Sequence, residues 1–181
     1  MIGVVNTLYE HMSLEYEEDS LKWAKDCGVA RENVYGGKQA FVGNPCHRLL
    51  ERVDLLQQLS EQRLIYGLSK YVKCFRAFKS VVSSCFSLKI DPDYITHCEE
   101  FKKSYLEIGI PITPKVHAVF FHVPYFCQKN GKGLGFFSEQ AIETVHSDFW
   151  KTCKNFKVKS SHPDYPNRLL KPVQKYNAEH I

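Results

Sequence analysis

The sequence predicts a mainly α-helical fold, a helical bundle-like fragment with little or no sheet. Apolar residues recur at helical spacing over several long stretches, and glycine and proline gather where these stretches end. No segment alternates convincingly between apolar and polar residues. Of the 181 residues, 44% are hydrophobic and 24% are charged, which is the usage of a globular protein and excludes wholesale disorder.

The first segment, residues 1–35, is expected to form one or two acidic helices. No glycine or proline falls between Val4 and Cys27, and acidic residues outnumber basic ones before Ala30. Glycines then interrupt the helical pattern, so Lys38–Val42 is predicted to be a loop or a short extended piece.

Residues 36–110 are expected to be a largely helical region. A helix should begin near Pro45, where leucine and valine start to recur at helical spacing, and a basic helix should follow Gly67 as far as about Leu88. An aspartate before Pro92 is a typical helix start, since it combines a capping acceptor with proline in the first turn. That helix should run from about Pro92 to about Glu107.

Residues 111–156 begin with a second start signal, Thr113 followed by proline, which predicts a helix to about Gln128 with Pro124 as a kink. A glycine-rich turn comes next, and a final helix is expected from Ser138 to about Phe156. The remaining residues, 157–181, are basic, polar and rich in proline, and we expect a disordered tail.

The composition of the sequence excludes several classes of protein. No apolar run is long enough to span a membrane, and the first residues do not resemble a signal peptide. Seven irregularly spaced cysteines favour a reducing, intracellular location over a disulfide framework. The net charge of +4 is mild and neither requires nor forbids an anionic partner.

The predicted basic helix alternates basic and aromatic residues and lies in a stretch, 62–90, that contains no acidic residue. Such alternation suits neutralisation of phosphates together with base stacking, so this helix is a candidate nucleic-acid contact. The alternative is that its aromatic residues are core and its cations merely solvated. The four candidate residues are Lys70, Lys73, Arg76 and Lys79.

Two histidines, His117 and His122, form a candidate metal site. Imidazoles are good zinc ligands, and two of them make half of a tetrahedral site. In a regular α-helix, however, positions five apart diverge by about 140°, so a shared ion requires a distorted helix. The proline at position 124 gives a reason for distortion, and the alternative is two histidines without a metal.

The final predicted helix carries Glu139, Glu143 and His146 on one strip beside its apolar stripe. A carboxylate at the border of a buried face can hold a divalent cation such as Mg²⁺. The alternative is an amphipathic helix whose first-turn acids interact favourably with the helix dipole.

Taken together, these motifs resemble the C-terminal part of the catalytic core of DDE-type transposases related to the V(D)J recombination-activating recombinase. The resemblance rests on the segment His117-Ala-Val-Phe-Phe-His122-Val-Pro, on the glycine turn and on Ser138-Glu139-Gln140 with Glu143 and His146. Upstream, Phe41-Val-Gly-Asn44 resembles the helical insertion of that family. The likeness spans roughly residues 36–156, and its specific part covers about thirty of them.

The resemblance implies a role for each of these residues. Glu143, with Glu139 as the alternate, corresponds to the last glutamate of the Asp-Asp-Glu triad, which in an intact relative helps to hold Mg²⁺ or Mn²⁺ for phosphoryl transfer. His117 and His122 correspond to half of a structural zinc site whose cysteine ligands would lie upstream. DNA is the implied partner, with the missing upstream part of a transposase or a second copy as further partners, and the nucleus is the implied location.

The sequence also departs from the family. The two strand-borne aspartates, the cysteine pair and the ribonuclease-H-like sheet have no counterpart here, so the chain alone should be inactive as a transposase. We therefore expect a partial, transposable-element-derived domain that binds DNA. The competing expectations are a domesticated protein–protein interaction module and a relic without function.

Overall fold

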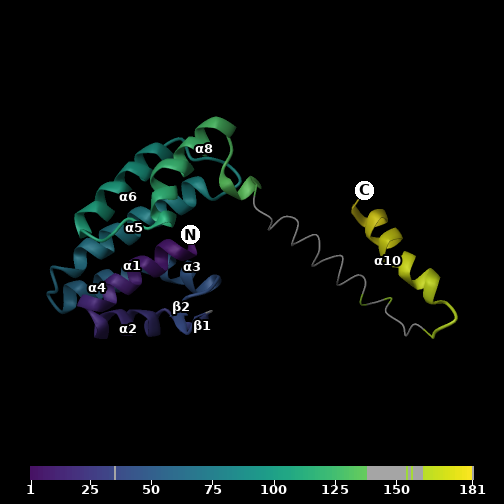
Figure 1. Cartoon of the computed structure of the whole chain (residues 1–181), viewed down its shortest axis with the longest axis horizontal. Coiled ribbons are helices and arrows are strands. Elements are labelled where there is room, and N and C mark those ends of the chain that lie inside the picture. The colour runs from purple at the N-terminus through teal and green to yellow at the C-terminus, as the bar shows by residue number, and fades with distance from the viewer. Residues whose placement is uncertain (35, 138–153, 155, 157–160, 181) are drawn as a thin grey trace. The chain divides into compact units, whose positions relative to one another are not determined.

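The structure is a computed structural model that describes residues 1–34, 36–137, 154, 156 and 161–180 (Figure 1). It divides into two compact units, Met1–Phe136 and Phe137–Ile181. The first unit is mainly helical, and the strands among its described residues form a single small hairpin. The predicted mainly α fold class is therefore confirmed.

The described residues up to Phe137 contain eight α-helices, two short strands and two short helical turns of other types. In chain order they are α1 (Ile2–Glu15), α2 (Glu17–Asp26), β1 (Glu32–Val34), β2 (Lys38–Ala40), α3 (Asn44–Glu51), α4 (Val53–Gln62), α5 (Leu68–Cys85), α6 (Tyr94–Ile108), α7 (Pro114–His117), the π-helix η1 (Ala118–His122), α8 (Val123–Asn130) and the 3-10 helix η2 (Leu134–Phe137).

Helix α5 is the central element of this unit. It lies beside α6 along much of its length and also contacts α1, α3, α4 and α8 (Figure 1). Its aromatic residues Phe75 and Phe78 are completely buried. The ring of Phe78 lies 4.9 Å from that of Phe101 on α6, which in turn lies 5.6 Å from Phe120 of η1. Aromatic contacts therefore join three separate elements of the first unit.

The extended piece predicted near Lys38 is the second strand of a hairpin. Strand β1 pairs antiparallel with β2, with Asn33 opposite Gln39. Just after the hairpin, Phe41 is fixed to α1 by the amide of Asn6, which accepts a hydrogen bond from the Phe41 N–H at 2.8 Å and donates one to its carbonyl at 2.9 Å. The side chain of Asn6 thus takes the place of a neighbouring strand.

The start and stop signals in the sequence are largely reproduced. Thr113 caps α7 by accepting a hydrogen bond from the Val116 N–H, and Gly109 ends α6 in the left-handed conformation. The glycine turn contacts the backbone after α5 closely, because a Cβ on Gly133 would lie 2.1 Å from the Ser87 carbonyl oxygen. Glycine is required at this position for steric reasons.

Two expectations need correction. The helix predicted from Pro45 is divided into α3 and α4 at Arg52, whose backbone leaves the helical conformation. The predicted disordered tail contains the helix α10 (Tyr165–His180), so that prediction is wrong for these residues. Its first turn is supported by Asp164, which forms ion pairs with Arg168 at 3.3 Å and Lys171 at 3.7 Å.

Candidate functional site

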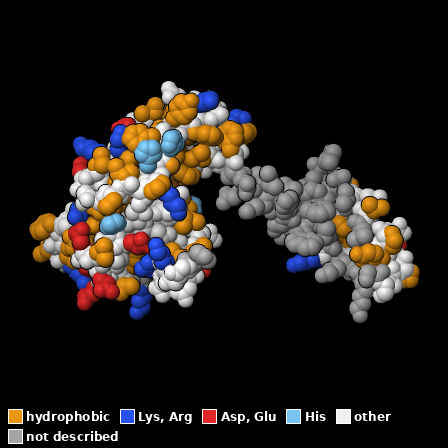
Figure 2. Space-filling view, viewed as in Figure 1, with side chains coloured by type: hydrophobic (Ala, Val, Ile, Leu, Met, Phe, Trp, Pro, Cys, Tyr) orange, Lys and Arg blue, Asp and Glu red, His pale blue; other side chains and the backbone are white. Residues whose placement is uncertain are grey.

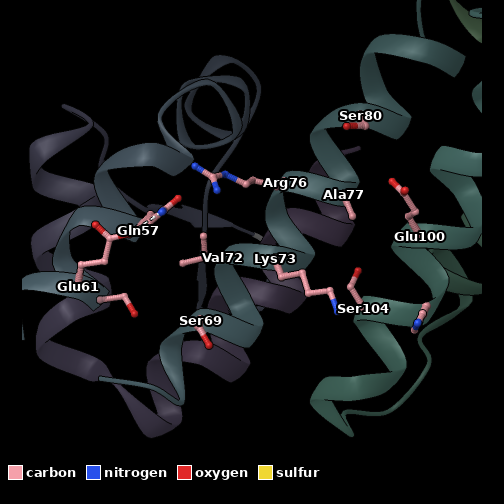
Figure 3. Close-up of a pocket in the computed structure, with 12 residues that line it drawn as sticks. Gln57, Glu61, Ser69, Val72, Lys73, Arg76, Ala77, Ser80, Glu100 and Ser104 are labelled. Carbon is pink, nitrogen blue, oxygen red and sulfur yellow. Dashed lines mark hydrogen bonds between the residues drawn. The ribbon is translucent and has the colours of Figure 1, made fainter. Parts of the chain in front are cut away.

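A groove with a volume of about 680 Å³, lined mainly by residues of polar and charged types, lies between α4, α5 and α6 (Figure 3). Val72 and Ala77 of α5 contribute apolar side chains to its lining, and three cations line it: Lys73 and Arg76 from α5, and Lys103 from α6. Serine and glutamine side chains from all three helices add hydroxyl and amide groups. We call this the α4–α5–α6 groove.

The four basic residues predicted to bind nucleic acid do not form one free patch. The helix turns them toward different neighbours, so that Lys73 and Arg76 line the groove whereas Lys70 and Lys79 do not. Each has a partner on another helix. Lys70 pairs with Glu15 (3.3 Å), Lys73 with Glu107 (2.7 Å) and Arg76 with Asp54, and Lys79 donates to the Glu51 carbonyl (3.2 Å).

The strength of these ion pairs determines whether Lys73 and Arg76 can bind a phosphate instead. The hydrogen bond from Arg76 lowers the pKa of the Asp54 carboxyl, and that from Lys73 lowers the pKa of Glu107, so both carboxylates are charged at neutral pH. On the face shown in Figure 2, basic and acidic side chains are interspersed over the first unit. Exposed ion pairs of this kind are weak, so a phosphate can compete for the cation.

Of the two interpretations of the aromatic residues in this helix, the structure supports the core position over base stacking. Phe75 and Phe78 are wholly buried and cannot stack on bases. Lys103, by contrast, was missed by sequence reasoning, because its contribution depends on how α6 lies against α5. Only the two glutamates of the groove, Glu61 and Glu100, offset the three cations among the residues that line it.

The structure brings His117 and His122 together. Their ring centroids are 5.3 Å apart, and both side chains are exposed. The residues between them form the π-helix η1, which is closed by a hydrogen bond from the Val123 N–H to the Ala118 carbonyl. The wider π-turn places positions five apart on one face, and the next residue, Pro124, cannot donate a backbone hydrogen bond.

The spacing of the two rings fits a shared ion. Zinc binds imidazole nitrogen at about 2.0–2.1 Å in tetrahedral geometry, which places two rings on one ion with their centroids about 5 Å apart. Among the residues that the structure describes, however, no group of three or more histidine, cysteine or acidic side chains could hold a metal. Two imidazoles are half of the ligands that a tetrahedral zinc site requires.

The predicted triad glutamate Glu143, its alternate Glu139 and the nearby His146 lie outside the described residues. No helix in the described part of the chain is both long and apolar enough to cross a membrane. Comparison with known protein families, with curated proteins and with solved structures finds no match to this chain.

Proposed function

We propose that this chain is a transposable-element-derived, partial DDE transposase domain that binds the DNA backbone and is not catalytic alone. The observation that carries the DNA-binding role is the α4–α5–α6 groove, where Lys73, Arg76 and Lys103 from two helices face one space. Lysine, arginine and serine are the usual donors to phosphate oxygens. The proposed role in turn favours a nuclear location.

The groove suits backbone contact better than base recognition. Its cations belong to exposed ion pairs or are themselves exposed, so they can exchange a carboxylate for a phosphate at low cost. None of the described residues that line it is aromatic, so base stacking contributes little. We therefore expect binding that is weakly dependent on sequence and strongly dependent on salt.

Catalysis by this chain alone is not part of the proposal. Phosphoryl transfer of the DDE type needs two divalent ions held by three carboxylates, and the sequence offers a counterpart only for the glutamate, Glu143. A magnesium-dependent activity would require the missing aspartates from elsewhere.

The DNA-binding proposal is tested by a salt titration of duplex binding. Replacing Lys73, Arg76 and Lys103 together by glutamine should reduce the slope of log K against log salt by about 2–3, because up to three phosphate contacts are lost. Binding is measured by fluorescence anisotropy at salt concentrations from about 50 to 200 mM, because DNA affinity that depends on phosphate contacts falls steeply over this range.

A matched control removes the same charge elsewhere. Lys22, Lys25 and Lys129 lie outside the groove. Their replacement by glutamine should leave the slope of log K against log salt within about 1 of that of the parent chain, because it changes the net charge but removes no proposed phosphate contact. Equal loss of affinity in both variants would show that only net charge matters. Absence of binding by the folded parent chain would contradict the proposal and favour an interaction module.

We further propose that His117 and His122 supply half of a zinc site, whose other ligands come from an upstream segment of a longer protein or from a second copy. The support is the 5.3 Å separation of their rings on η1. Zinc would act there as a structural cross-link between segments.

Zinc affinity should then depend on both histidines. Replacing either one by alanine should weaken zinc binding at least about tenfold, because half of the protein's ligands are lost. A competition titration with a chromogenic chelator measures this. The exposed His47 is the matched control; if its alanine variant weakened zinc binding equally, the two histidines would not form the site.

A further inference from the structure

Three cysteine thiols converge in the core of the first unit. Cys85 is the last residue of α5, Cys98 lies on α6 and Cys127 lies on α8, and all three are buried. The Sγ atoms of Cys85 and Cys98 are 3.8 Å apart. Neither the DNA groove nor the histidine pair uses these thiols.

The sulfur atoms of Cys85 and Cys98 are already in contact. An S–S bond measures about 2.0 Å, so closure needs the two sulfur atoms to approach by roughly 1.8 Å, which is within the reach of side-chain rotation and a small shift of the helix end. The pair joins α5 to α6, the two helices with the most extensive mutual contact. Only a short loop separates the helices in sequence, so the thiols stay close together.

We propose that Cys85 and Cys98 are a redox-sensitive thiol pair that forms an intramolecular disulfide between α5 and α6 when the protein meets a peroxide. The Cys85 sulfur attacks one peroxide oxygen, the O–O bond breaks, and a sulfenic acid and water form. The Cys98 sulfur then displaces the sulfenic oxygen as a second water. Two thiols thus lose two electrons and two protons, and hydrogen peroxide is reduced to two waters.

The surroundings favour Cys85 as the first thiol to react. The hydrogen bond from Cys98 lowers the pKa of the Cys85 thiol against the opposing effect of burial, with further help from Ser84 and Cys127. The same interaction, together with burial, raises the pKa of Cys98. Cys85 is fully buried in the closed structure, so the proposal requires the end of α5 to open locally before a small oxidant reaches the thiol, as helix ends do more readily than helix centres.

The direct test is disulfide mapping of the unaltered chain. The reduced protein is treated with hydrogen peroxide, remaining thiols are alkylated in denaturant, and the chain is cut after lysine and arginine. Cleavage places Cys85, Cys98 and Cys127 in separate peptides, 80–89, 90–102 and 116–129. The expected major product joins peptide 80–89 to peptide 90–102 and disappears on reduction.

Thermal unfolding provides an independent readout. The disulfide should raise the midpoint of the oxidised protein by about 6–12 °C, and a reductant should reverse the rise. Cys98→Ser should abolish both the linked peptide and the rise, whereas Cys74→Ser, a matched variant of another buried cysteine, should retain both. A major link from Cys85 to Cys127, or peroxide oxidation without any link between peptides 80–89 and 90–102, would overturn the proposal.

Discussion

Replacing Phe101 by alanine should lower the free energy of unfolding by about 3–5 kcal/mol. The ring of Phe101 is completely buried and lies at the centre of the aromatic cluster. It contacts Phe78 of α5 at 4.9 Å, Phe120 of η1 at 5.6 Å and Tyr105 of its own helix at 5.8 Å. Its removal leaves a cavity where three elements meet, and this cavity cannot close without moving α6.

Urea unfolding of the full chain, followed by circular dichroism, measures this effect. The matched control is Tyr66→Ala. The Tyr66 side chain is 83% exposed, so this substitution should lower the free energy of unfolding by less than about 1 kcal/mol. An equal effect of both substitutions would contradict the central position of Phe101. Because α6 carries Lys103 of the groove, the same variant should also weaken the proposed DNA binding.

Replacing Asn6 by alanine should destabilise the first unit by about 2–3 kcal/mol, far more than the loss of an ordinary surface amide. Phe41 is buried, and its N–H group is satisfied by the Asn6 side chain. Without the amide, this N–H group has no partner in the core. The Phe41 carbonyl keeps a weaker contact with the Cys46 thiol at 3.5 Å.

Two further variants make the Asn6 prediction specific. Asn6→Asp keeps an acceptor for the Phe41 N–H but loses the donor to its carbonyl, so its cost should fall between those of the parent and the alanine variant. Asn130→Ala removes an exposed hydrogen bond to the Phe126 carbonyl and should cost less than about 1 kcal/mol. Chemical denaturation ranks the three variants by their free energy of unfolding. If Asn6→Ala destabilised the protein no more than Asn130→Ala, the proposed role of the Asn6 amide would be refuted.

The redox pair and the groove involve the same two helices, although they are independent proposals. Lys73 and Arg76 lie on α5 and Lys103 on α6, and the Cys85–Cys98 pair connects these helices near the end of α5. A disulfide would therefore limit changes in the separation of α5 and α6. DNA binding measured before and after oxidation would show whether the two features are coupled.

The contact between the two histidines could be predicted from the spacing of the motif. The interval between His117 and His122 indicates a shared site only if the helix between them is distorted, and the proline at position 124 is a local reason for distortion. The π-turn provides that distortion and brings the rings to 5.3 Å. The contact depends on the backbone conformation of a few consecutive residues, so the local sequence was sufficient to predict it.

The groove is different, because its members are brought together by helix packing. The spacing of Lys73 and Arg76 is visible in the sequence, but the approach of Lys103 from α6 and the pairing with Glu107 and Asp54 are not. The burial of Phe75 likewise follows from which face of α5 meets its neighbours.

Local signals in the sequence therefore determined the helical class, most helix ends and the two histidines as a pair, since capping, proline and helical periodicity act within a few residues. Tertiary structure alone decided which cations share a groove, why Asn6 matters and which of the cysteines meet. These contacts join residues on different helices, such as Cys85 and Cys98, and depend on how the helices pack around one hydrophobic core. Periodicity states which face of a helix is apolar, but it does not state which other helix covers that face.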